Sequence, residues 1–316
     1  MASSDRTPVS LTSSDFEERT RIIRQFLAGA GSGALTKTSV APLERLKVIK
    51  QTSGMRTGGP QYNQGIYHAL STIVKEHGIR GLYKGNGANC VRVIPVYALK
   101  FSLNDKFKEM MLVWRIEGGD DPQLSFLEKM AAGSMAGTVQ ILATYPLDII
   151  RTRLQLAEIA GSSYKGIADC AMTTIRHEGL LGLYKGLFPS MLAGVPYVGL
   201  QMTFYDMLKT AWGPYLPRRE DGSIGVVGML ACGSVAGLTA QTLSFPSDTV
   251  RHRMQANGIN GTTKVYVNTM DCFQKIYTKE GVGGFFKGWG LNVLRALPGA
   301  AVQFTAYDSL KRVLGV

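Results

Sequence analysis

A proline followed by an acid and a base occurs three times in this chain, at intervals of 104 and 100 residues. Acid and base stand three residues apart, so in a helix they share one face, and the proline bends that helix by removing a backbone donor. If the three helices close into a ring, each acid can pair with the base of a neighbouring copy, which predicts a charged gate. The acids and bases are Glu44, Lys47, Asp148, Arg151, Asp248 and Arg251. A glutamine stands four residues after each base, at Gln51, Gln155 and Gln255.

A second acid and base pair, again three residues apart, occurs once in each repeat. The pairs are Asp105 with Lys108, Asp206 with Lys209 and Asp308 with Lys311. Tyr205 and Tyr307 precede the last two acids. By the same reasoning these residues predict a second charged ring, at the opposite end of the helices that carry it.

The elements that position these rings are long apolar segments. Residues 130–147, 186–205 and 225–246 contain no charged side chain and are about long enough to cross a hydrocarbon core. The repeat requires three further spans, which fall on 22–50, 86–110 and 289–312. Isolated cations interrupt these three spans, namely Lys37, Arg92, Lys100 and Arg295. A cation within a membrane is costly and normally faces a wet interior, although the sequence assigns no role to Lys100.

An aromatic residue, a lysine and a glycine recur between the two long segments of each repeat. They stand at residues 83–85, 184–186 and 286–288, each after a short amphipathic stretch such as 166–177. Such stretches are typical of helices that lie along a membrane face. The expected organisation is a polar tail at 1–20 and three repeats at 21–120, 121–220 and 221–316.

Composition narrows the class of partner. Lys and Arg outnumber Asp and Glu by 35 to 23, which suits an anionic partner. The cations interrupt apolar spans instead of forming an exposed stripe, so a nucleic-acid partner is not expected. The four cysteines are scattered without metal-ligand spacing, and no nucleophile and base form a recognisable motif. The sequence therefore predicts no metal, no cofactor and no enzyme.

Specificity should lie where the three repeats differ. Thirteen residues before each acid of the second ring stand Arg92, Ala193 and Arg295, and five before each proline stand Lys37, Ile141 and Gln241. Lys37, Arg92 and Arg295 are expected to converge without an acid to neutralise them. Three such cations suit a multiply charged phosphate or carboxylate compound.

The three signatures together resemble the mitochondrial carrier family over residues 22–312. The resemblance implies an all-α membrane protein of the inner mitochondrial membrane. It would have six transmembrane helices in three tandem repeats with pseudo-threefold symmetry, plus three short matrix-side surface helices. A peroxisomal, plastid or reduced-mitochondrion membrane stays open.

The family pattern assigns partners within both rings. It pairs Glu44 with Arg151, Asp148 with Arg251 and Asp248 with Lys47 in a matrix gate braced by Gln51, Gln155 and Gln255. It pairs Asp105 with Lys209, Asp206 with Lys311 and Asp308 with Lys108 in a cytoplasmic gate braced by Tyr205 and Tyr307. Two gates around a fixed central site imply alternating access.

Among carriers, the motifs are closest to the branches that exchange adenine nucleotides (ADP, ATP, AMP). The resemblance assigns solute binding to Lys37, Arg92, Ala193, Gly194, Tyr197, Ser244 and Arg295. Residues 251–256 read RHRMQA where the ADP/ATP branch has RRRMMM, so carriers of coenzyme A, adenosine 3′,5′-diphosphate or thiamine pyrophosphate stay open. An uncoupling protein that leaks protons is a further alternative. A functional monomer with membrane lipid as partner, cardiolipin on the matrix side, is expected.

Overall fold

The computed structural model describes residues 13–55, 62, 65–117, 125–162, 164–215, 225–261 and 264–315, and all regular structure within them is helical. Its long helices are α1 (Ser13–Thr52), α3 (Asn86–Glu117), α4 (Phe126–Leu156), α6 (Leu187–Trp212), α7 (Val226–Ala256) and α10 (Trp289–Leu314). They follow the six long segments that the repeat requires. No helix in the described ranges passes a combined test of length and apolarity for a membrane span.

Short helices connect the long ones in each repeat. They are α2 (Ile66–Gly81), α5 (Ile167–Glu178), α8 (Thr269–Glu280) and α9 (Val282–Phe285), with 3₁₀ turns at Ser53–Met55, Glu158–Ala160, Leu180–Tyr184, Gly213–Tyr215 and Ile259–Gly261. The stretch expected as an amphipathic surface helix at 166–177 is α5. Its N-terminal neighbour in the repeat, α4, begins at a capping box in which Ser125 and Glu128 satisfy each other's backbone N–H groups.

The N-terminal helix begins where Ser14 and Glu17 form a capping-box pattern in the sequence, which lies inside the expected polar tail. α1 starts at Ser13, inside the stretch expected to be a polar tail, and residues 1–12 lie outside the described ranges.

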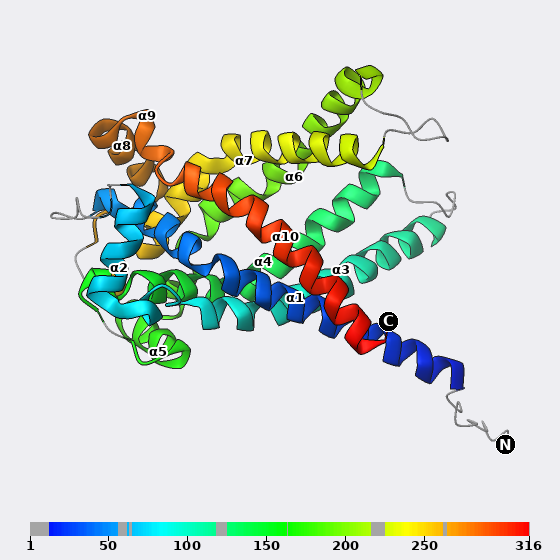
Figure 1. Cartoon of the computed structure of the whole chain (residues 1–316), viewed down its shortest axis with the longest axis horizontal. Helices are drawn as coiled ribbons and strands as arrows, with labels where there is room; N and C mark the ends of the chain where they lie inside the picture. The colour runs from blue at the N-terminus through cyan, green and yellow to red at the C-terminus, as the bar shows by residue number, and fades with distance from the viewer. Residues whose placement is uncertain are drawn as a thin grey trace.

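The long helices pack in three pairs, α1 with α10, α3 with α4 and α6 with α7. Figure 1 shows α2, α5 and α8 gathered at one end of the molecule, which we call the short-helix end. The long helices diverge from there toward the other end, which we call the terminal end because both chain termini lie on that side. Small residues allow close packing: a Cβ added to Gly31 of α1 would lie 2.9 Å from Leu310 Cδ1 of α10.

The short-helix end is closed by three glycines in equivalent positions. Gly85, Gly186 and Gly288 end the aromatic-lysine-glycine signatures, and all have φ near +80°, a region that side chains disfavour. An added Cβ at each would lie 2.9–3.2 Å from the backbone carbonyl of the motif base in a neighbouring repeat. The glycines therefore let each connection lie directly against the next repeat.

Three fully buried arginines, Arg45, Arg153 and Arg253, join neighbouring repeats near this contact, and we call them the arginine belt. Arg45 Nε donates to the Gln155 carbonyl at 3.2 Å, Arg153 Nε to Gln255 at 3.3 Å and Arg253 Nε to Gln51 at 2.9 Å. Each repeat is thus tied to the next by a charged donor on a backbone acceptor.

An acid neutralises each arginine of this belt. Glu178, at the end of α5, forms an ion pair with Arg153. Glu280, at the end of α8, forms an ion pair with Arg253. In the first repeat His77 stands at the equivalent position. Arg45 pairs with Glu158 of the second repeat, and Arg45 Nη2 lies 3.0 Å from Glu158 Oε2. Burial alone would raise the pKa of Glu280, but hydrogen bonds from Arg253 and Lys287 hold that pKa below its ordinary value.

Candidate functional site

The proline motifs meet in a ring of three ion pairs between repeats. Arg151 contacts Glu44, Arg251 Nη2 lies 2.9 Å from Asp148 Oδ2, and Lys47 Nζ lies 2.7 Å from Asp248 Oδ2. All six charged atoms come from α1, α4 and α7, just beyond the prolines inside those helices. The acid of one repeat therefore pairs with the base of another, and the ring bars the short-helix end.

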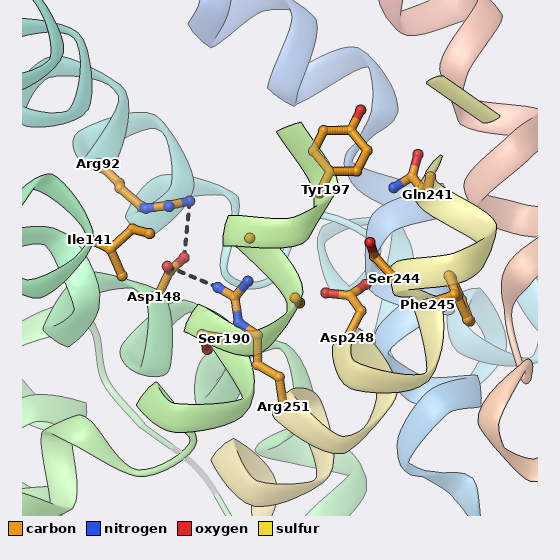
Figure 2. A pocket seen from close by; sticks show the side chains of 12 residues that line it. Arg92, Ile141, Asp148, Ser190, Tyr197, Gln241, Ser244, Phe245, Asp248 and Arg251 are labelled. Atoms are coloured by element: carbon orange, nitrogen blue, oxygen red, sulfur yellow. Dashed lines mark hydrogen bonds and ion pairs between the residues drawn. The ribbon is translucent and has the colours of Figure 1, made fainter. Parts of the chain in front are cut away.

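A cavity lies on the terminal-end side of this ring, in two adjoining parts. The side pocket, about 290 Å³, is lined by Ile141, Ser190, Ala193, Gly194, Tyr197 and Ser244 among others. The gate pocket, about 210 Å³, is lined by Lys37, Glu44, Lys47, Arg151, His252 and Arg295 among others. Figure 2 shows the side pocket. Arg92, Gln241, Asp248 and Arg251 line both pockets, which therefore share walls. All seven residues assigned to solute binding thus border this cavity.

The expectation that the three cavity cations have no acid is wrong. Arg92 Nη1 lies 2.9 Å from Asp148 Oδ1, Arg295 Nη1 lies 2.9 Å from Glu44 Oε1, and Lys37 Nζ lies 3.5 Å from the same oxygen. A carboxylate has two oxygens and can accept several donors, so one ring acid serves cavity cations as well as its partner in the ring. Figure 2 shows Asp148 held between Arg92 and Arg251 in this way.

Positive charge nevertheless exceeds negative charge around the cavity. Three carboxylates face six cationic side chains, which are Lys37, Lys47, Arg92, Arg151, Arg251 and Arg295. The excess of three charges sits in a partly enclosed space, where charges interact more strongly than in bulk water. A polyanion entering the cavity can replace the shared carboxylates as partner of Lys37, Arg92 and Arg295.

Two asparagines that the sequence interpretation overlooked support these charges. Asn89 Nδ2 donates to Glu44 Oε2 at 3.2 Å, and Asn292 Oδ1 accepts from Arg295 Nε at 3.3 Å and Nη2 at 3.2 Å. Both side chains are buried. They occupy equivalent places, four residues after Gly85 and Gly288, and that spacing was the available signal.

Two of the three motif glutamines bond to hydroxyl groups of neighbouring helices. Gln51 Nε2 donates to Thr249 Oγ1 at 3.2 Å, Gln255 Nε2 donates to Tyr145 OH at 3.2 Å, and Gln155 Oε1 has no partner among the described residues. The braces expected from these amides to the ion pairs are absent from the described part of the chain.

The second set of acids and bases is exposed at the terminal end. Among the described residues no ion pair joins Asp206 to Lys311 or Asp308 to Lys108, and all three acids, Asp105 included, are exposed. Tyr205 and Tyr307 are half-buried. The side chain of Lys100 lies outside the described part of the structure. The structure thus has one ring closed, at the short-helix end, while the helices that carry the other ring diverge.

Comparison with known proteins gives the class. The family model described as "Mitochondrial carrier protein" matches residues 18–113, 122–215 and 222–316. Relatives include the mitochondrial adenine nucleotide transporter ADNT1 of Arabidopsis thaliana, 36% identical over 93% of this chain and 88% of its own length. The mitochondrial carrier protein CoAc2 of Zea mays is 35% identical over 93% of this chain and 87% of its own length.

The mouse mitochondrial adenyl nucleotide antiporter SLC25A24 is also 35% identical over 93% of this chain. The chain spans 58% of that relative's length. Three family matches and relatives above 30% identity show that the chain belongs to the mitochondrial carrier family. Its place as a multi-pass protein of the inner mitochondrial membrane follows from that membership.

Proposed function

We propose that this chain exchanges adenine nucleotides across the inner mitochondrial membrane. The observation that carries the proposal is the excess of cations over carboxylates around a cavity closed at one end. ATP and ADP carry several negative charges, and Arg side chains bind phosphate oxygens in pairs. The adenine nucleotide transporter and antiporter among the relatives support the same cargo.

The six long helices are the proposed membrane spans. Their charged residues Lys37, Arg92 and Arg295 border the central cavity, where water and solute can solvate them, so they need not contact lipid. The short helices α2, α5 and α8 would lie along the matrix face. One chain supplies every residue of the cavity, which supports a functional monomer.

The ring of ion pairs serves as the matrix gate in this proposal. Closed at the short-helix end and divergent at the terminal end, the structure would be the state that admits solute from the cytoplasmic side (Figure 1). A nucleotide bound to Lys37, Arg92 and Arg295 would remove two donors from Glu44 and one from Asp148. The ring would then open as the second ring, Asp105–Lys209, Asp206–Lys311 and Asp308–Lys108, closes.

Coenzyme A is the second candidate cargo, because the maize relative is named CoAc2. Coenzyme A combines an adenine ring with phosphates, as do the nucleotides, and would use the same cations. Adenosine 3′,5′-diphosphate and thiamine pyrophosphate belong to the same chemical class.

A lipid phosphate is a further proposed partner, at a separate cavity of about 470 Å³. Lys50, Thr242, Gly288 and Trp289 line it, and Trp289 Nε1 donates to Thr242 at 2.9 Å. The N-terminus of α10 opens onto it and favours an anion. Cardiolipin, with two phosphates, fits this chemistry.

Thermal stability with each solute tests the cargo. Detergent-solubilised protein is heated with ADP, ATP, AMP, coenzyme A or thiamine pyrophosphate, and a solute bound at 100 times its Kd stabilises by about 2.7 kcal/mol. We expect the largest increase in unfolding temperature with an adenine nucleotide. The same solute should be exchanged by liposomes loaded with ADP. Stabilisation and exchange by coenzyme A alone would transfer the proposal to the second candidate.

A further inference from the structure

One level of the cavity carries three chemically different side chains in equivalent positions. Five residues before each motif proline stand Lys37, Ile141 and Gln241, which are a cation, an apolar group and an amide. Lys37 lines the gate pocket, Ile141 lines the side pocket, and Gln241 lines both. Symmetry is therefore broken at this level by charge, apolarity and hydrogen-bonding capacity, which are the three properties of a nucleotide's phosphate, ring face and ring edge.

The side pocket supplies apolar and aromatic surface beside Gln241. A Cβ added to Gly194 would lie 3.9 Å from Ile141 Cδ1, so the absent side chain leaves room between α6 and α4. Tyr197 adds an aromatic ring on the same helix as Gly194. Figure 2 shows Tyr197 and Gln241 at one edge of the pocket, away from Arg92. A flat base can lie there while its phosphates reach the cations of the gate pocket.

The amide of Gln241 is available to a ligand. Within the described residues its side chain makes no hydrogen bond, and it is half-buried at the cavity wall. Two other glutamine amides are engaged, since Gln303 Nε2 donates to Ser32 at 3.1 Å and Gln255 bonds two hydroxyl groups, whereas Gln155 Oε1 has no partner among the described residues and does not line the cavity. A glutamine amide offers a donor and an acceptor side by side, the pattern that matches the N6 and N7 positions of adenine.

We propose that Gln241 reads the adenine base, with Nε2 donating to N7 and Oε1 accepting from the N6 amino group. The proposal rests on the nucleotide exchange proposed above and adds to it the residue that selects the base. Guanine carries an oxygen acceptor at position 6 in place of the amino group, so it loses one of the two hydrogen bonds. Gln241 thereby favours adenine over guanine.

Exchange in liposomes tests this with three probes: ATP, GTP and 7-deaza-ATP, which lacks the N7 acceptor. Wild-type protein should exchange ATP faster than both analogues, measured as kcat/KM. A bidentate base contact discriminates by about 5- to 150-fold. Gln241→Leu should reduce both preferences to near unity, mainly by slowing ATP. Gln241→Arg, which offers donors alone, should shift the preference toward GTP.

Gln140→Leu is the matched control, because Gln140 is a half-buried glutamine of α4 that does not line the cavity among the described residues. It should keep the wild-type ratios.

If Gln241→Leu keeps the wild-type ratios of ATP to GTP and to 7-deaza-ATP, the assignment to Gln241 is overturned while nucleotide exchange stands. If wild-type protein exchanges none of the three, the proposed function itself fails. If the Gln241→Leu protein does not fold, the exchange rates of ATP and 7-deaza-ATP in wild-type protein still test the N7 contact. Equal rates for these two solutes would overturn that contact.

Discussion

Arg295 of α10 and Glu44 of α1 are 251 residues apart in the sequence, yet Arg295 Nη1 lies 2.9 Å from Glu44 Oε1. The other oxygen of Glu44, Oε2, accepts a hydrogen bond from Arg151 of α4. One carboxylate therefore joins a cation of the cavity to a pair of the ring. Since both cations compete for the same acid, an anion that binds Arg295 must alter the environment of the ring pair, which provides a physical link between cargo and gate.

The Lys47–Asp248 pair predicts a result for reversed charges. Lys47→Asp places two carboxylates together at a buried site and should lower the free energy of unfolding by about 3–5 kcal/mol. Adding Asp248→Lys restores the opposite charges and should recover most of that loss. Unfolding temperatures in detergent measure both. A double variant no more stable than Lys47→Asp would show that the pair does not hold the ring.

The arginine belt predicts a large loss of stability at Arg153. Arg153→Ala removes donors to the Gln255 carbonyl, Thr174 and Glu178 and leaves Glu178, whose side chain is 5% exposed, with Lys185 alone. We expect a loss of about 3–5 kcal/mol. Arg115→Ala is the control, because Arg115 pairs with Glu128 in a more exposed site and its loss should change stability little. Equal unfolding temperatures for the two variants would contradict the belt's role.

Acid should weaken the contact between α7 and α8. The pKa of Glu280 is lowered in the folded protein, so its ion pair contributes stability above the ordinary value near 4.5, and that stability is lost as pH falls through the lowered value. Between pH 6 and the acid range, wild type should therefore lose more stability than Glu280→Gln. Denaturant titrations at each pH measure the two curves. Parallel curves would mean that Glu280 has no lowered pKa.

Thiol labelling should distinguish the cysteines. Burial raises the pKa of Cys170 to about 11 and of Cys272 to about 12, and both are buried, whereas Cys90 is half-buried. At pH 8 a maleimide should modify Cys90 first and reach Cys170 and Cys272 after unfolding, since the thiolate is the reactive form. Mass spectrometry of timed samples identifies the labelled residues. Rapid labelling of Cys272 in folded protein would contradict its burial in α8.

The repeat made most of the fold predictable. Three copies of one motif fix the number of units, and the long apolar segments together with the repeat predict six long helices, which are found. The repeat predicted that each ring acid pairs with a base of a neighbouring unit, and the resemblance to the carrier family supplied the particular partners. The start of α1 at Ser13 was also predictable, because Ser14 and Glu17 fit a capping-box pattern.

Sharing of carboxylates could not be predicted from spacing. Lys37 and Glu44 are seven residues apart on α1, about 10 Å along the axis, and two long side chains close that distance. Which of several donors reaches an acid depends on how helices cross, and the sequence does not specify crossing angles. The Arg45–Glu158 pair has the same cause, because Glu158 comes from the second repeat while His77 stands at the position that Glu178 and Glu280 occupy in the other two.

The central claim, that cavity cations bind the phosphates of the cargo, is tested most directly by ADP exchange with Arg92→Ala and Arg295→Ala proteins. Liposomes containing wild type, either variant or Arg115→Ala are loaded with ADP, and uptake of labelled ADP is followed. Each cavity variant should lose about tenfold or more in kcat/KM, since a charged hydrogen bond is worth about 1.5–3 kcal/mol, while Arg115→Ala should match wild type. Undiminished uptake by a folded Arg92→Ala or Arg295→Ala protein would contradict the account.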